Sequence, residues 1–360
     1  MRGVLQRIFA QDFASYPRRR RLAIRERRAV HAICTCRTAA QGTHVRICPR
    51  GDYIEHFYNS CKHRSCPRCG GWETVKWVQQ QEARLLPCPY YHIVFTLPKE
   101  LNVLWQFNRA SFVNHLFQAA WGTLSKLYQN ERWVGGLPGA LMVFQSWGET
   151  LNTHPHLHVL ITAGGLNKQG IWKTANQSYL FPTAALTKVF RGKLLDALGH
   201  ALFKKNTLIQ PPGQDREHWL RLFNTLRAKP WHAHIQPPYD HPMGVIRYLA
   251  FYIKGGPIAE DRITRLPDHQ IRIAYKRPDE HRSQWITLPT QEFFRRFLNH
   301  VPPKGSRTVR AYGLFHHRAK AKTDQARNAI PPTAPEARGD LDPQHHEHTR
   351  SPSPRPTGFR

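Results

Sequence analysis

All seven cysteines of this 360-residue chain lie in its first quarter, which sets that quarter apart from the rest. Cys66-Pro67-Arg68-Cys69 has the Cys-x-x-Cys spacing that wraps zinc, with Cys61 five residues upstream and Cys48 before it. A disulfide scaffold would need an oxidising compartment and usually a small secreted domain. The cysteines therefore predict a small zinc-ribbon-like domain over residues 31–88, held by a structural Zn²⁺.

The ligand set of this zinc site is not fixed by spacing alone. Cys48-Pro49-Arg50-Gly51 resembles a first Cys-x-x-Cys turn (a zinc knuckle), but Gly51 occupies the position of the second cysteine. The missing ligand could be Cys61, or it could be Cys36, His44 or His63. The expected zinc ligands are drawn from Cys36, Cys48, Cys61, Cys66 and Cys69.

The charge of the chain points to a polyanionic partner. Lys and Arg number 53 against 24 Asp and Glu, for a formal net charge of +29. A hydrophobic content of 40% with 10 Trp, 12 Tyr and 18 Phe excludes wholesale disorder. No run approaches the roughly 18 apolar residues of a membrane span, and no signal peptide opens the chain. We expect an intracellular protein that is not associated with a membrane.

The two ends of the chain have their own character. Residues 1–30 read as a basic helical arm that contains four consecutive arginines, Arg18, Arg19, Arg20 and Arg21. These arginines form either a solvated helix face or a contact with phosphates. Residues 319–360 are rich in Pro, Ala, Arg and His with few large apolar residues, which predicts a disordered basic tail.

The remaining region, residues 89–318, mixes strands and helices. Short β-branched and aromatic runs predict strands at 91–96, 141–147 and 156–162, and the connection between the last two fits an antiparallel pair. Helical spacing of apolar residues predicts helices within 101–130 and 186–228. A further helix is expected from residue 240 to about 254, and strands plus a helix within 270–300.

Two histidines on the third of these strands form the first candidate catalytic feature. His156 and His158 are two residues apart, so on a strand their imidazoles point to the same face. Two neutral imidazoles are an incomplete ligand set for a divalent cation, to be completed by a carboxylate or amide oxygen, water and substrate phosphate. On the neighbouring strand Gln145 and Glu149 are expected to point to a common face, and either could supply that oxygen. The alternative is that these are core or surface histidines in a chain that has 22.

A pair of tyrosines in the helix at 240–254 forms the second feature. Tyr248 and Tyr252 are four residues apart and share one helix face, where they could also be ordinary amphipathic packing. A phenol with a pKa of about 10 needs activation before it can attack a phosphate. A metal beside the phosphate, together with Lys254, would supply a suitable field.

The order of these motifs resembles the rolling-circle insertion-sequence transposases of the IS91 type, which join a zinc-binding N-terminus to a two-tyrosine HUH nuclease domain. The resemblance spans about residues 25–315. It rests on these segments: Cys36-Arg37-Thr38, Ser60-Cys61, Cys66-Pro67-x-Cys69, Phe95-Thr96-Leu97-Pro98, Gln145, Leu151-Asn152, His156-Leu157-His158, Tyr248-x-x-x-Tyr252, Phe293 to Leu298, Pro303-Lys304-Gly305 and Arg310-Ala311-Tyr312-Gly313.

This resemblance implies an α+β fold with a central antiparallel sheet that carries the histidine pair, flanked by helices, with the tyrosine helix nearby. It implies that His156 and His158 bind Mg²⁺ or Mn²⁺, with Gln145 preferred to Glu149 as third ligand. It also implies that a tyrosine attacks single-stranded or hairpin DNA at the element ends, forming a 5′-phosphotyrosine without any nucleotide cofactor. A transposase of this type is expected in the bacterial cytoplasm, associated with the nucleoid. The alternatives are a replication initiator or relaxase with the same chemistry, and a non-catalytic zinc-ribbon protein that binds nucleic acid.

Overall fold

The computed structural model describes residues 3–16, 21–176, 180–239, 242–254, 256–276 and 282–331, and the side chains of 72, 248, 251, 252 and 254 are also outside the described part. Residues 1–330 form one compact unit, and residues 331–360 are grouped apart from it. Among the described residues, no helix is long and apolar enough to cross a membrane.

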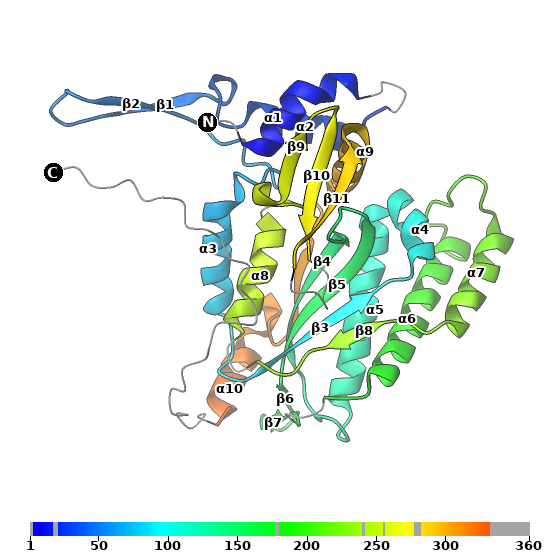
Figure 1. Cartoon of the computed structure of the whole chain (residues 1–360). Helices are drawn as coiled ribbons and strands as arrows, with labels where there is room; N and C mark the ends of the chain where they lie inside the picture. The colour runs from blue at the N-terminus through cyan, green and yellow to red at the C-terminus, as the bar shows by residue number, and fades with distance from the viewer. Residues whose placement is uncertain are drawn as a thin grey trace. The chain divides into compact units, whose positions relative to one another are not determined.

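A five-stranded antiparallel sheet lies at the centre of the larger unit (Figure 1). The strand order is β12-β4-β5-β3-β8. Its strands are β3 (Tyr90–Thr96), β4 (Gly139–Trp147), β5 (Thr153–Thr162), β8 (Ala233–Ile235) and β12 (Val309–Gly313). The strands predicted at 91–96, 141–147 and 156–162 are confirmed, and the last two form the expected antiparallel pair. The predicted α+β class with a central antiparallel sheet is therefore confirmed.

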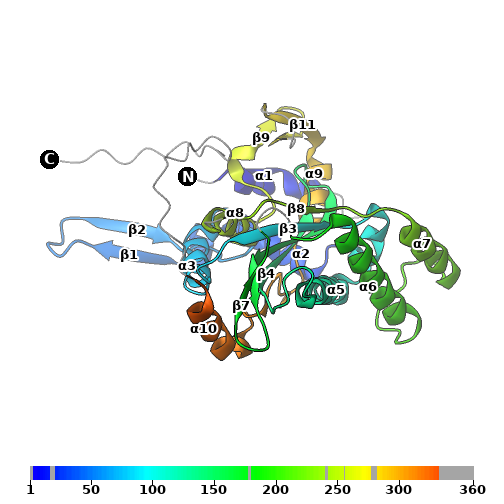
Figure 2. The same cartoon turned by 90° about the horizontal axis from the view of Figure 1, so that it is seen from below.

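The two faces of this sheet are covered by different helices (Figure 2). One face carries Phe95, Phe144 and Leu157, which pack in the largest apolar cluster of the protein. The helices on that face are α4 (Asn102–Phe107), α5 (Arg109–Gln129), α6 (Thr183–Phe203) and α7 (Arg216–Ala228). The opposite face packs against α3 (Gly70–Glu82), α8 (Met243–Lys254) and α10 (Lys320–Ala329).

A second layer is built from segments at both ends of the chain. Helices α1 (Val4–Asp12) and α2 (Ile24–Thr35) pack with the three-stranded sheet β9 (Ile263–Leu266), β10 (Gln270–Tyr275) and β11 (Gln284–Pro289), and with α9 (Thr290–Asn299). Phe9 lies with its ring centroid 4.8 Å from that of Phe294 and 5.3 Å from that of Phe297. The N-terminal segment is helical as expected, but its helices are docked on the protein rather than forming a free arm.

Smaller strand pairs complete the fold. The cysteine-rich segment contains the hairpin β1 (Thr43–Ile47) and β2 (Ile54–Tyr58), which is largely exposed. Strands β6 (Gly164–Leu166) and β7 (Trp172–Thr174) form another pair.

The start of the predicted disordered tail is helical, which corrects that prediction. Helix α10 covers Lys320–Ala329, and Ala326 on it is fully buried. The single hydroxyl hydrogen of Thr323 is shared between the carbonyls of Leu314 and Ala319, and the contact with Leu314 attaches the helix to the preceding loop. The prediction of disorder relied on the scarcity of large apolar residues. Small alanines nevertheless allow this helix to pack closely. Residues 332–360 of the predicted tail are outside the described residues.

Candidate active site and zinc centre

The two candidate metal-binding histidines lie side by side on β5, with their ring centroids 4.8 Å apart. Gln145 on β4 is directly opposite His156 in the strand register, and Val143 is opposite His158. Directly opposite residues of an antiparallel pair point to the same face of a sheet. Gln145, His156 and His158 therefore share one face, and all three are buried. The predicted grouping of Gln145 with the histidine pair matches this geometry.

The tautomer of His156 is set by the strand itself. Its Nδ1 lies 2.7 Å from the carbonyl oxygen of His154, and a carbonyl can only accept a hydrogen bond. Nδ1 therefore carries the proton, and Nε2 carries the lone pair that a metal ion needs.

The tautomer of His158 is set by a chain of three side chains. Tyr239 donates to Oε1 of Gln236 over 2.6 Å, and the same oxygen lies 2.7 Å from Nδ1 of His92. His92 must donate to this oxygen, so its Nε2 is an acceptor. That Nε2 lies 3.0 Å from Nδ1 of His158, which therefore donates. His158 consequently also has its lone pair on Nε2.

Burial keeps these imidazoles neutral. It lowers the pKa of His156 to about 4, and it lowers the pKa of His158 well below its ordinary value, with the neighbouring His156 and His92 adding to the effect. Burial likewise lowers the pKa of His92. Neutral imidazole nitrogens and an amide oxygen form a donor set that suits a divalent cation with open positions. The residues present therefore fit the expected metal site.

Glu149, the other candidate for the third ligand, is placed differently from what the sequence suggests. The register of β4 and β5 shifts between Gln145 and Trp147, and β4 ends at Trp147. Glu149 lies in the turn beyond this bulge, where its side chain is exposed and pairs with Arg262 at 2.9 Å. The expectation that Gln145 and Glu149 share a strand face is wrong, because the bulge and the strand end break the two-residue alternation.

The helix that carries the tyrosines covers the histidine face of the sheet. Val245, Ile246 and Leu249 of α8 are buried in one apolar cluster with Leu141 and Val143 of β4. Val143 is opposite His158, so α8 packs on the face from which both histidines project. The helix expected from residue 240 to about 254 is thus confirmed, with its apolar residues against the sheet. Tyr248, Tyr252 and Lys254 belong to α8, but their side chains lie outside the described part of the structure.

Four cysteines come together in the N-terminal region. The Sγ atoms of Cys36, Cys61, Cys66 and Cys69 all lie within 4.8 Å of one another, as tetrahedral binding of one zinc ion requires. Cys36 follows the end of α2, and Cys69 precedes α3. Hydrogen bonding from Cys61 lowers the pKa of the Cys36 thiol to about 7, and hydrogen bonding from Cys36 lowers the pKa of Cys69. These two thiols thus favour the thiolate form that binds zinc.

The other candidate zinc ligands are not part of this group. Cys48 lies at the start of the β1–β2 loop, where its N–H donates to the carbonyl of Tyr53. His44 bonds to the side chain of Asn59 at 3.0 Å, and Nδ1 of His63 accepts from the backbone of Ser65. Cys36 therefore completes the set, and the incomplete knuckle at Gly51 does not contribute a ligand. The predicted ligand Cys48 is corrected, because its loop belongs to the exposed hairpin.

Comparison with known proteins identifies the family and agrees with the zinc centre. Residues 8–97 match the family described as "Transposase zinc-binding domain" of the IS91 type, and residues 139–323 match the family described as "Putative transposase". The putative transposase y4qJ of Sinorhizobium fredii is 31% identical over 325 residues, which are 87% of this chain and 80% of that relative. This chain belongs to the IS91-type transposases.

Two further proteins are similar to this transposase. The transposase for insertion sequence element IS801 of Pseudomonas savastanoi pv. phaseolicola is 31% identical over 280 residues, covering 75% of this chain and 64% of that protein. The N-terminal origin-recognition/nickase domain of human bocavirus non-structural protein 1 aligns with a TM-score of 0.27 and 12% identity, over 69% of this chain and 99% of that one. A TM-score this low carries no weight for the fold.

The zinc-binding match of the transposase begins inside the segment predicted as a basic arm. Arg18, Arg19 and Arg20 of that segment are outside the described residues, and Arg21 is exposed. The match runs from residue 8 to residue 97, so it includes α2 and the zinc-binding domain expected at residues 31–88.

Sequence reasoning missed several residues that shape the two centres of the transposase. Alternation along β3 does put His92 on one face of its strand, but nothing in the sequence shows that the strand pairs with β5. Gln236 and Tyr239 follow a three-residue strand too short to be recognised. Arg64, which lies between two zinc ligands, contacts residues more than 240 positions later in the chain.

Proposed function

We propose that this transposase nicks single-stranded DNA at the ends of its element and rejoins strands through a 5′-phosphotyrosine intermediate, in a rolling-circle transposition that depends on a divalent metal. The observation that supports this most is the packing of α8, which carries Tyr248 and Tyr252, on the sheet face that presents His156 and His158. A nucleophile helix and a metal-binding pair on one face are the two parts that such a reaction needs.

His156 and His158, with Gln145, would hold Mg²⁺ or Mn²⁺ through their Nε2 atoms and the amide oxygen. A divalent cation bound there would polarise the scissile phosphate and offset the charge that develops on it. The protein prepares this site by fixing both tautomers in advance and by keeping the imidazoles neutral.

The chemical step exchanges one phosphate ester for another. The phenolic oxygen of Tyr248 or Tyr252 bonds to phosphorus, and the bond between phosphorus and the 3′ oxygen breaks. The phenol loses one proton and the departing oxygen gains one, giving a free 3′-hydroxyl. Lys254, two residues after Tyr252, favours the phenolate by its positive charge. Because the phosphotyrosine bond conserves the energy of the phosphodiester, a hydroxyl can later reverse the step without a nucleotide cofactor.

A covalent-adduct assay tests this proposal. A 5′-labelled or 3′-labelled strand carrying an element end is incubated with the protein and Mg²⁺ or Mn²⁺, and the adduct is resolved by denaturing electrophoresis. We expect label from the 3′ portion to stay with the wild-type protein and the Tyr248→Phe/Tyr252→Phe double variant to trap none. Tyr53→Phe, a change at an exposed tyrosine of the β1–β2 loop, serves as the matched control.

The possible outcomes separate the candidate functions. Adduct formation that survives in the double variant would place the nucleophile elsewhere. Unchanged DNA binding with no adduct in any protein would favour a non-catalytic zinc-ribbon protein. A replication initiator or relaxase would form the same adduct, and membership of the transposase family favours transposition over that alternative.

A further inference from the structure

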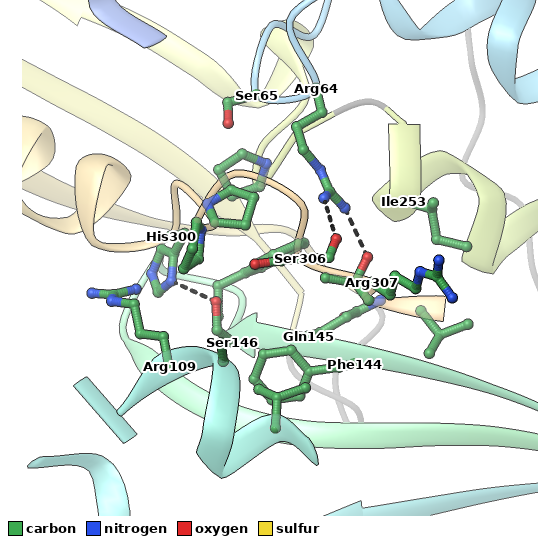
Figure 3. Close-up of a pocket in the computed structure, with 18 of the residues that line it drawn as sticks. Arg64, Ser65, Arg109, Phe144, Gln145, Ser146, Ile253, His300, Ser306 and Arg307 are labelled. Atoms are coloured by element: carbon green, nitrogen blue, oxygen red, sulfur yellow. Dashed lines mark hydrogen bonds between the residues drawn. The ribbon is translucent and has the colours of Figure 1, made fainter. Parts of the chain in front are cut away.

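A cavity of about 300 Å³ lies beside Gln145 at the C-terminal end of β4 (Figure 3). Strand β12 pairs with β4 only as far as Val143. Beyond that point the loop before β12 runs along β4 instead, and Phe144 donates its N–H to the carbonyl of Thr308 over 2.8 Å. The cavity opens between this loop, the end of β4 and the α4–α5 corner. It therefore borders the proposed metal site through Gln145.

The zinc-binding region forms one wall of this cavity. Arg64 donates to the carbonyl of Ser306 over 3.1 Å and to the hydroxyl of Thr308 over 2.7 Å (Figure 3). Gly256, just after α8, has a φ of +79°, and a Cβ there would lie 2.8 Å from the carbonyl oxygen of Ser65. The loop between zinc ligands Cys61 and Cys66 is thus fitted against both the cavity loop and the end of the tyrosine helix. Zinc binding consequently helps to shape the cavity.

The lining of the cavity is strongly basic. Among the described residues that line it there are five cations and no Asp or Glu: Arg64, Arg109, Lys304, Arg307 and Arg310. Arg64 and Arg310 are anchored by hydrogen bonds to neutral groups, and Arg310 also lies over the ring of Phe117 at 4.4 Å. Lys304 and Arg307 are exposed at the rim. An anionic ligand would therefore contact positively charged side chains held by hydrogen bonds inside the cavity, and exposed positively charged side chains at its entrance.

Buried polar groups on the wall also lack partners. Gln145 is 4% exposed and Trp105 is 2% exposed, yet Nε2 of Gln145 and Nε1 of Trp105 have no hydrogen-bond partner among the described residues. Both groups are donors, and an unsatisfied buried donor costs about 1–3 kcal/mol. Both nitrogens are covered in this state, so a small turn of either side chain toward the cavity would let it donate to an acceptor oxygen or nitrogen of a ligand. The side chains of Phe144 and Val113 add apolar surface beside these donors.

We propose that this cavity holds one unpaired nucleotide of the DNA strand, next to the phosphate that the tyrosine attacks. This inference rests on the proposed nuclease function. A nucleotide combines an apolar base, acceptor atoms on its edge and an anionic phosphate, which together match the wall, the donors and the cations. A volume of about 300 Å³ is at the lower end of ligand pockets, as a single small unit requires. A paired base could not enter, so the cavity selects single-stranded DNA.

The cavity rim includes a segment that takes no part in the proposed catalytic chemistry. Pro303-Lys304-Gly305 lies in the loop that forms the cavity rim, and Gly305 has a φ of +76° that lets the loop turn there. Lys304 and Arg307 on this loop would bind the phosphate of the captured nucleotide.

DNA binding by rim variants of the full chain tests this inference. The double variant Lys304→Ala/Arg307→Ala removes two exposed charges at the rim, and Lys188→Ala/Lys193→Ala removes two exposed charges from α6 as a control. Fluorescence anisotropy with EDTA present measures the affinity of each protein for a labelled single-stranded oligonucleotide and for its duplex. We expect the rim variant to lose about tenfold or more in affinity for the single strand, and the control less than about threefold. Both variants should lower the affinity for the duplex by the same factor.

Three results would overturn the proposal. The first is equal loss of single-strand affinity in the rim and control variants, and the second is a rim effect that is the same for duplex and single strand. The third is displacement of the oligonucleotide by inorganic phosphate as effectively as by thymidine 5′-monophosphate, which would indicate an anion site instead. Because EDTA prevents cutting, these results are independent of adduct formation, so failure of this inference and failure of the nuclease proposal are distinguishable.

Discussion

The candidate metal ligands show how single hydrogen bonds prepare a residue for chemistry. His156 is oriented by a backbone carbonyl of its own strand, whereas His158 is oriented through His92, Gln236 and Tyr239. Both arrangements place the lone pair on Nε2. Partners of metal-binding histidines act in this way because they fix the tautomer and the ring orientation before the ion arrives.

The role of His92 can be measured through metal affinity. Replacing His92 with Leu removes the acceptor for the Nδ1–H of His158, so this ring can turn or change tautomer. We expect Mn²⁺ affinity, measured from free Mn²⁺ by electron paramagnetic resonance, to fall about 10-fold to 100-fold. Zinc content should not change. His234→Leu, an exposed histidine on β8, is the control. Unaltered Mn²⁺ affinity in the His92 variant would show that the hydrogen-bond chain does not orient His158.

His300 gives the protein a defined response to acid. It is buried, with Nδ1 accepting from Ser146 and Nε2 donating to the carbonyl of Leu151. Burial lowers the pKa of His300 to about 4, so the unfolded chain binds this proton first as the pH falls. The protein keeps its full free energy of unfolding above the unfolded-chain pKa of about 6.5, and part of that free energy is lost as the pH falls toward 4. The part that is lost amounts to about 3 kcal/mol.

Urea unfolding of the wild type and of His300→Gln across this pH range measures the effect. The wild-type free energy of unfolding should fall more steeply than that of the variant between pH 6.5 and 4, by up to about 1.4 kcal/mol per pH unit. Zinc release at low pH affects both proteins, so the difference between them isolates His300. Parallel pH profiles would mean that His300 is not held neutral in the fold.

At the scale of elements, the sequence predicted those whose pattern is local. Strands β3, β4 and β5 follow from short β-branched and aromatic runs, and helix α8 follows from a helical stretch ahead of a Gly-Gly-Pro stop. The antiparallel pairing of β4 with β5 was also expected, but the register that places Gln145 opposite His156 is not fixed by the sequence. The bulge after Gln145 has no local signal in the sequence, so the prediction that Glu149 lies on the same strand face was wrong. Helix α10 was missed because its packing uses alanines. The docking of α1 was missed because its partners, Phe294 and Phe297, are almost 290 residues away.

The choice of Cys36 over Cys48 as zinc ligand is an element-scale question, because each belongs to a different element. Cys36 ends α2 next to the other three thiols, and Cys48 starts the loop of an exposed hairpin. We expect Cys48→Ser to keep one zinc per chain by atomic absorption and to keep the wild-type melting temperature. Cys36→Ser should bind zinc more weakly and melt at a lower temperature, since zinc binding contributes folding energy. The reverse pattern would place Cys48 in the site.

For the whole molecule, distant parts of the chain meet at one edge of the central sheet. The zinc-binding loop contributes Arg64, the middle of the chain contributes the end of β4, and the region before the last strand contributes the loop from Pro302 to Thr308. No spacing rule could reveal this meeting, because it depends on contacts between segments about 240 residues apart. Zinc bound by the four cysteines would hold the loop that carries Arg64, and through it the loop from Pro302 to Thr308.

The basic excess of the whole chain predicts how DNA binding responds to salt. A formal charge of +29 is spread over the molecule, so binding should release counterions from many phosphates. If about six phosphates are contacted, the logarithm of the single-strand association constant should fall with the logarithm of salt concentration with a slope of about −4. Affinity would then drop roughly 300-fold between 50 and 200 mM salt. Anisotropy titrations over this range measure the slope, and a flat response would show that the positive charge does not contact the DNA backbone.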